Sequence, residues 1–153
     1  MALKLNSAAF ADNAKIPERH TCDGANLSPP LAWSGAPTGT RSFALICCDP
    51  DAPGGTWYHW AAYDIPPDVA ALAEGRKAGG PGAPRQGIND FGHAGYGGPC
   101  PPHGHGTHRY RFMLYALKLE RLPVAGPPHC RDVERMAKTN AIEQAALVGL
   151  YGR

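Results

Sequence analysis

The amino-acid sequence predicts a mostly-β fold, an antiparallel β-sandwich with one or two short helices toward its C-terminal end. Three observations lead to this prediction. Apolar segments of strand length alternate with turns along the chain. The 19 glycines and 16 prolines among 153 residues separate these segments without removing their aliphatic and aromatic content. Helical spacing of apolar residues appears only late in the sequence. The length is that of one domain, residues 1–153.

Strands are expected where apolar runs lie between turn-forming residues, namely at 3–10, 31–33, 41–48, 57–65, 108–119 and 147–151. The run 41–48 (RSFALICC) is almost continuously apolar, which is typical of a central strand buried on both faces. Period-two alternation within 57–65 predicts that His59 shares a face with Ala61 and Tyr63, and that Trp60 lies on the opposite face.

Two helices and one long loop are expected between these strands. Apolar residues have helical spacing over 131–144, with a break at Thr139–Asn140, and a weaker helix is expected over 68–75. The segment 79–106 contains ten glycines and five prolines in 28 residues. A loop of this length in a compact domain is usually functional or disordered, and its anchoring polar and aromatic residues favour function.

Composition excludes several classes of protein. The formal net charge is +2, and lysine and arginine form no cluster that could follow a phosphate backbone, so no nucleic-acid partner is expected. No segment approaches the roughly 18 apolar residues of a membrane span, so no integral membrane segment is expected. The first ten residues lack the apolar core of a secretion signal.

The cysteines are expected to be reduced. Their number is odd and no pair has CxxC spacing, which together with the missing signal favours free thiols and a cytoplasmic location. The five positions are Cys22, Cys47, Cys48, Cys100 and Cys130.

Four polar residues lie at or near predicted strand ends. Asp49 follows the central strand, His59 lies early in the next strand, and His108 and Tyr110 lie where the long loop joins its strand. A carboxylate can hold an imidazole in one tautomer and favour its charged form, which gives a donor for an anion. The tyrosine hydroxyl and loop N–H groups would add neutral donors. The group predicts a pocket for a phosphate ester or a carboxylate; the alternative is that Asp49 only forms a turn and each histidine is satisfied locally.

Metal and covalent chemistry have weaker support. Histidines are dense at 93–108, but there is no HExxH and no paired-cysteine motif, so neither a metal nor another cofactor is expected. Cys100 near His108 has the ingredients of a thiol hydrolase, although Pro99 and Pro101 flank it and no helix N-terminus activates it. The tryptophans, including Trp57, are expected in the core.

Three separated motifs resemble one known family. The segment DPDAP at 49–53 precedes an aromatic strand with His59, and GPCPP at 98–102 precedes Gly104 and HRYRF at 108–112. A third motif, CDGANLSPPLAW, covers 22–33. The chain therefore resembles the phosphatidylethanolamine-binding proteins, and especially their bacterial branch, the Raf kinase inhibitor-like proteins, over essentially its whole length.

The resemblance implies an antiparallel β-sandwich with a small anion pocket at one end. Its ligand-binding residues, carried over by position, are Asp49, His59, Pro102, His108 and Tyr110. Its supporting residues are Asp51, Trp57, Gly98, Cys100 and Arg109. Among these, Asp51 and Arg109 are expected to brace the site, and backbone groups around 98–100 are expected to donate to the ligand.

The function implied is non-enzymatic binding of a small phosphorylated or anionic ligand, such as a phospholipid head group, a nucleotide or a phosphorylated residue, with modulation of a kinase or protease as its outcome. Two alternatives stay open: a hydrolase or lyase that uses the Asp/His group, and an interaction module that presents the loop 95–107. The sequence departs from the animal members by a polar insertion at 103–107, whose histidines are expected to face solvent, and by the lack of an evident C-terminal extension over the pocket. Bacterial members often dimerise, so a homodimer is an open alternative.

Overall fold

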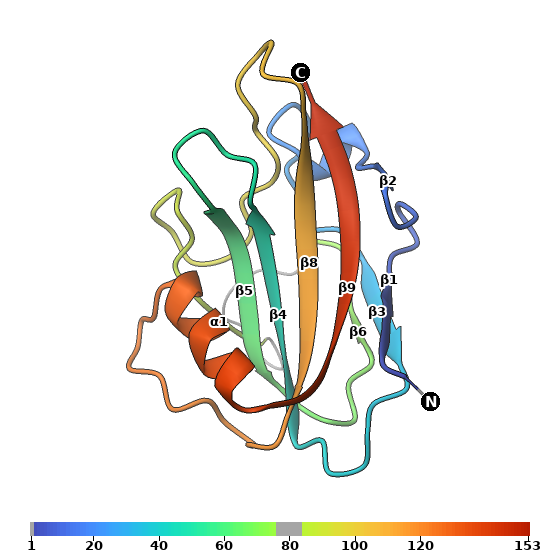
Figure 1. Ribbon diagram of the computed structural model, residues 1–153, viewed down its shortest axis with the longest axis vertical. Coiled ribbons are helices and arrows are strands. Elements are labelled where there is room, and N and C mark those ends of the chain that lie inside the picture. Colours follow the sequence, from blue (N-terminus) through green and yellow to red (C-terminus); the bar gives the residue numbers. More distant parts are fainter. Residues whose placement is uncertain (1, 76–83) are drawn as a thin grey trace.

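The computed structural model describes residues 2–75 and 84–153. Within these residues the chain forms a six-stranded sheet, a three-stranded sheet and one α-helix (Figure 1). The large sheet has the order β2 (Ala14–Lys15), β9 (Ala141–Gly152), β8 (Thr107–Leu117), β4 (Ser42–Asp49), β5 (Trp57–Ile65) and β7 (Arg85–Gln86). The small sheet has the order β1 (Lys4–Asn6), β3 (Leu31–Ser34) and β6 (Ala71–Leu72). The helices are the 3-10 turn η1 (Glu18–His20) and α1 (Cys130–Thr139).

The large sheet is covered on both faces. The small sheet packs on one face through a cluster that includes Trp33, Phe43 and Phe112, and α1 packs on the other through a cluster that includes Ile46 and Val133. Figure 1 shows α1 alongside β5. All strand pairs are antiparallel except β2–β9. The predicted class, a mostly-β sandwich, is confirmed.

The boundaries of the central strands lie within two residues of the predicted ones. Every residue of β4 is buried, as a strand with a sheet or helix on each face requires. β5 covers 57–65, and β8 covers 107–117 with Tyr110 and Phe112 facing the small sheet. These three strands carry the site described below, because the end of β4 and the starts of β5 and β8 lie together at one end of the large sheet (Figure 1).

The prediction of a helix over 131–144 is wrong in its second half. α1 ends at Thr139, where the Asn140 side chain donates to the Met136 carbonyl and stops the helix. The chain then enters β9, which is much longer than the predicted 147–151 because Ala141–Gly152 pairs with the whole of β8. Sheet pairing outweighs the local helical spacing here.

The helix expected over 68–75 is also absent. Ala71 and Leu72 instead form β6 on the edge of the small sheet, where Leu72 pairs with Leu31. The long loop 79–106 lies partly outside the described residues, and its remaining part includes the short strand β7. No helix in the described parts of the chain is long and apolar enough to cross a membrane.

Candidate functional site

A cavity of about 200 Å³ opens where β4 ends and where β5 and β8 begin. All five predicted ligand-binding residues line it: Asp49, His59, Pro102, His108 and Tyr110. The predicted supporting residues Trp57 and Cys100 line it as well. The structure therefore brings the sequence-predicted group together, and ligand binding by these residues stays a prediction.

The centre of the site is a buried carboxylate–imidazole pair. His108 Nδ1 lies 2.6 Å from Asp49 Oδ2, and the two side chains are 2% and 4% exposed. Because a carboxylate only accepts, Nδ1 must donate the proton, and Nε2 is the nitrogen left for other partners. The other oxygen of Asp49 accepts the Asp51 N–H at 2.8 Å. Asp49 is thus both a turn former and the partner of an imidazole, so the alternative in which it only forms a turn is wrong.

The side chain of His105 contacts the ring nitrogen of His108 that Asp49 does not bind. The expectation that the histidines of the insertion face solvent is half correct, because His105 is exposed but its Nδ1 lies 2.5 Å from His108 Nε2. The insertion folds back because Gly104 and Gly106 adopt positive φ and because the Gly104 N–H donates to the Arg153 carbonyl. A ligand that approaches His108 Nε2 must therefore displace His105 or bind beside it.

A β-bulge aims His59 into the cavity. Cys47 pairs with Trp60 and Cys48 pairs with Tyr58, so His59 is an extra residue without a partner on β4. The bulge shifts the alternation by one residue and turns the His59 ring toward Tyr110, with ring centroids 5.2 Å apart. The predicted face for His59, shared with Ala61, is wrong for this reason.

Burial keeps the His59 ring neutral. Its Nδ1 lies 2.6 Å from the Gly97 carbonyl, to which it donates, so Nε2 is left as an acceptor. Burial lowers the pKa of His59, and the hydrogen bond to Gly97 and the charge of Asp49 oppose this shift. In the absence of a ligand, His59 therefore offers a lone pair, and it becomes a donor only when it takes up a proton.

Tyr110 supplies a neutral hydroxyl. The residue is only 1% exposed, and burial, followed by the nearby Asp49 charge, raises the pKa of its phenol above the ordinary value. The phenol therefore keeps its proton and can act as a hydrogen-bond donor.

Two exposed aromatic side chains form the rim of the cavity. Trp57 and Phe91 are 38% and 43% exposed, and their ring centroids lie 5.5 Å apart. Trp57 was expected in the core, which is wrong, whereas Trp33 and Trp60 are buried as expected. Sequence reasoning missed Phe91 as a rim residue; the available signal was an aromatic side chain between the turn formers Asp90 and Gly92.

An ion pair links the turn after β4 to β8. Arg109 contacts the Asp51 carboxylate through Nε at 2.9 Å and Nη2 at 2.8 Å, and its backbone N–H donates to the same group. The hydrogen bonds from Arg109 lower the pKa of Asp51 to about 2. The pair is largely exposed, so its effect is to fix the turn beside His108 rather than to stabilise the whole fold.

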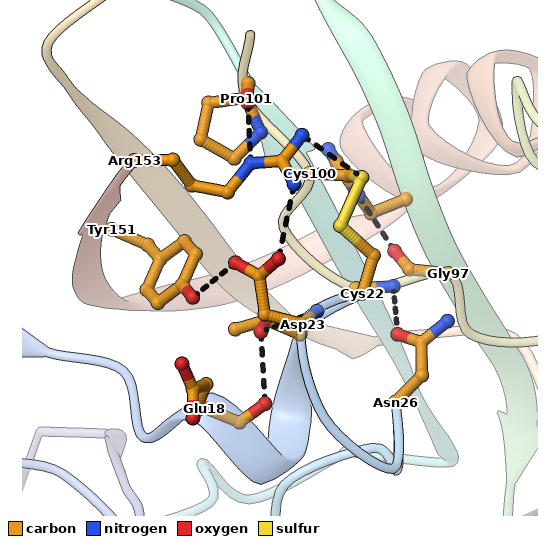
Figure 2. The surroundings of a disulfide bond; sticks show 12 residues. Glu18, Cys22, Asp23, Asn26, Gly97, Cys100, Pro101, Tyr151 and Arg153 are labelled. Carbon is orange, nitrogen blue, oxygen red and sulfur yellow. Dashed lines mark hydrogen bonds and ion pairs between the residues drawn. A yellow bond between two sulfur atoms is a disulfide. The ribbon is translucent and has the colours of Figure 1, made fainter. Parts of the chain in front are cut away.

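The expectation of reduced thiols is wrong for two cysteines. Cys22 and Cys100 form a disulfide across 78 residues of sequence, with their Cα atoms 5.4 Å apart (Figure 2). The other three, Cys47, Cys48 and Cys130, are free and buried, and burial raises the pKa of Cys48 to about 11 and that of Cys130 to about 12. In this structure the sulfur of Cys100 is held in the disulfide and is not presented as a thiol.

Gly98 supports the site by close packing. A Cβ atom at this position would lie 2.3 Å from the His20 carbonyl oxygen, so only glycine allows the loop to approach this closely. The Gly98 N–H donates to Asn26 Oδ1 at 2.8 Å. This N–H is therefore already used, contrary to the expectation that it would donate to a ligand.

The dense histidines do not assemble into a metal site. Among residues 2–75 and 84–153, no three histidine, cysteine or acidic side chains are placed to hold a metal ion.

Comparison with known proteins agrees with this geometry. The family model described as phosphatidylethanolamine-binding protein matches residues 6–152. A UPF0098 protein of Aquifex aeolicus is 45% identical over 152 residues, which cover 99% of this chain and 89% of the relative. A UPF0098 protein of Methanothermobacter thermautotrophicus is 46% identical over 99% of both chains. The crystal structure of Escherichia coli YbcL, described as a new member of the mammalian PEBP family, has a TM-score of 0.92 and 36% identity over 100% of this chain and 99% of YbcL. On these grounds the chain belongs to the phosphatidylethanolamine-binding protein family.

Proposed function

We propose that the protein is a non-enzymatic binding protein for small anions that carry a phosphate group, and that this group binds between His108 and His59. The observation that carries the proposal is the buried Asp49–His108 pair at the wall of a small cavity. Family membership supports a binding function in general.

The electrostatics of the pocket favour an anion whose binding is accompanied by proton uptake on the two imidazoles. His108 is oriented by Asp49, so a second proton on its Nε2 gives an imidazolium whose charge the carboxylate compensates. His59 gains a donor in the same way. With the Tyr110 hydroxyl, and with His105 displaced from His108 Nε2, the protonated pocket would offer three donors to phosphate oxygens.

Binding accounts for the site better than covalent catalysis does. The sulfur of Cys100 is held in a disulfide, and the raised pKa of Tyr110 disfavours a phenolate nucleophile.

A kinase or protease partner and a homodimer stay predictions from the family resemblance. The disulfide favours an oxidising compartment over the cytoplasm that the sequence suggested.

Calorimetry with inorganic phosphate and with phosphoethanolamine tests the proposal. We expect wild-type protein to bind both, and His108→Ala to lose at least tenfold in affinity, because a charge-assisted hydrogen bond contributes more than about 1.4 kcal/mol. Arg111→Ala is the matched control, since Arg111 is an exposed residue of the same strand that does not line the cavity. Equal affinities for wild type and His108→Ala would refute the proposal.

Anion affinity is expected to rise as the pH falls. Burial lowers the pKa of His59 below its ordinary value of 6.5, so the ring is neutral at pH 7–8 and must take up a proton to donate. One obligatory proton gives a gain of about tenfold in affinity per pH unit lowered above that pKa. Sulfate is the suitable probe because its charge does not change in this range. His59→Gln should flatten the dependence, and a pH-independent sulfate affinity of the wild type would contradict the assignment.

A further inference from the structure

The disulfide forms part of the wall of the anion pocket. Cys100 lines the cavity, while Cys22 belongs to the segment that follows η1, on the far side of the disulfide (Figure 2). The bond therefore ties the pocket loop to a separate part of the chain.

Few other contacts can fix this part of the loop. Upstream of Cys100, the Cys22 N–H donates to the Pro99 carbonyl at 3.1 Å and Asn26 accepts from Gly98. Downstream, Pro101 and Pro102 have no N–H and cannot donate to the framework. The Pro101 carbonyl accepts a 2.8 Å hydrogen bond from Arg153 Nε. The disulfide is the covalent attachment of the wall where Pro102 meets the cavity, and the Arg153 side chain and the His105 N–H, which donates to the Pro102 carbonyl, are its hydrogen-bonded ones.

The surroundings of the disulfide favour its reduction by a thiol. Cys100 is exposed and Cys22, whose sulfur is the one attacked, is half-buried, so a reductant can reach the bond. Arg153 Nη2 lies 3.6 Å from Cys100 Sγ, and a guanidinium there stabilises the thiolate that leaves when Cys22 Sγ is attacked. Arg153 is itself held by Asp23, at 3.0 Å from Nη1, and Asp23 accepts from the Tyr151 hydroxyl (Figure 2). This network keeps the positive charge beside the sulfur.

We propose that the redox state of the Cys22–Cys100 disulfide sets the affinity of the pocket for phosphate; this inference rests on the proposed function. A dithiol reductant attacks Cys22 Sγ, the S–S bond breaks, and Cys100 leaves as a thiolate that takes up a proton. The second reductant thiol then attacks the mixed disulfide and releases the Cys22 thiol. The two cysteines gain two electrons and two protons, and the dithiol becomes a cyclic disulfide. The loop around Pro102 then keeps only its hydrogen bonds, and the phosphate site loses the covalent attachment of its wall.

Phosphate titration of oxidised and of dithiothreitol-reduced protein tests the inference, with thiol counting to establish that two thiols have formed. We expect at least a tenfold weaker affinity after reduction and full recovery after reoxidation. The variant C22S/C100S should bind as weakly as reduced protein and should not respond to the reductant. Arg153→Gln should slow the reduction.

The outcomes separate the two proposals. If oxidised protein binds phosphate and reduced protein binds it equally well, the redox inference falls and the proposed function stands. If oxidised protein binds no phosphate, the proposed function falls and takes the inference with it. The ring NMR signals of His59 and His108 give a readout without ligand: they should shift on reduction of the wild type and stay unchanged in C22S/C100S, and unchanged signals in the wild type would also overturn the inference.

Discussion

Asp49→Ala is expected to destabilise the fold and to abolish anion binding. The substitution leaves His108, whose side chain is 2% exposed, without the acceptor for Nδ1. The loss in the free energy of unfolding is that of an unsatisfied buried donor, about 1–3 kcal/mol. Urea unfolding of the wild type and of the variant measures this loss.

Asp51→Ala is the matched control for Asp49→Ala. It removes a carboxylate two residues away that pairs with exposed Arg109, and the pKa of Asp51 is about 2. This variant should be only slightly less stable than the wild type, with no change between pH 5 and 8 because Asp51 stays ionised throughout. If Asp49→Ala behaved in the same way, the buried pair would not stabilise the fold as argued.

Removal of the disulfide is expected to have the second large effect. The bond closes a loop with a sequence separation of 78, and the entropy that it removes from the unfolded chain corresponds to about 4.5 kcal/mol. The variant C22S/C100S should therefore unfold at a markedly lower urea concentration than oxidised wild type. Two-state domains commonly have about 5–15 kcal/mol of stability, so the variant should still fold.

Reduced wild type provides the comparison for this variant. Its unfolding midpoint in excess dithiothreitol should approach that of C22S/C100S, and the variant's own midpoint should not respond to the reductant. A wild-type midpoint that is the same with and without reductant, after thiol counting has established reduction, would show that the bond does not stabilise the fold.

The sequence predicted those elements whose pattern is set by burial alone. β4 is apolar throughout because both of its faces are covered, and the ends of β4, β5 and β8 follow from the turn residues beside them. The same strand ends place Asp49, His59 and His108 together, which is why the site residues could be proposed before the structure.

Features that depend on contacts between distant segments could not be predicted in this way. Residues 141–144 have helical spacing, but their pairing with β8 decides their conformation. The disulfide joins residues that no local motif links, and the contact of His105 with His108 depends on the Gly104–Arg153 hydrogen bond. Each of these involves a partner that only the folded chain brings near.

The bulge at His59 separates the pocket from the core. Trp60 and Ala62 face the small sheet through their own pairing with Cys47 and Leu45, and the extra residue His59 has no partner on β4. Deleting one residue of the turn that precedes β5, such as Gly54, would leave the bulge and the core in place and would only shorten the turn. Deleting His59 would restore a regular ladder with an intact core and would remove the imidazole altogether. Natural or designed variants of this strand can therefore lose the pocket chemistry and keep the fold, by a change of length rather than of composition.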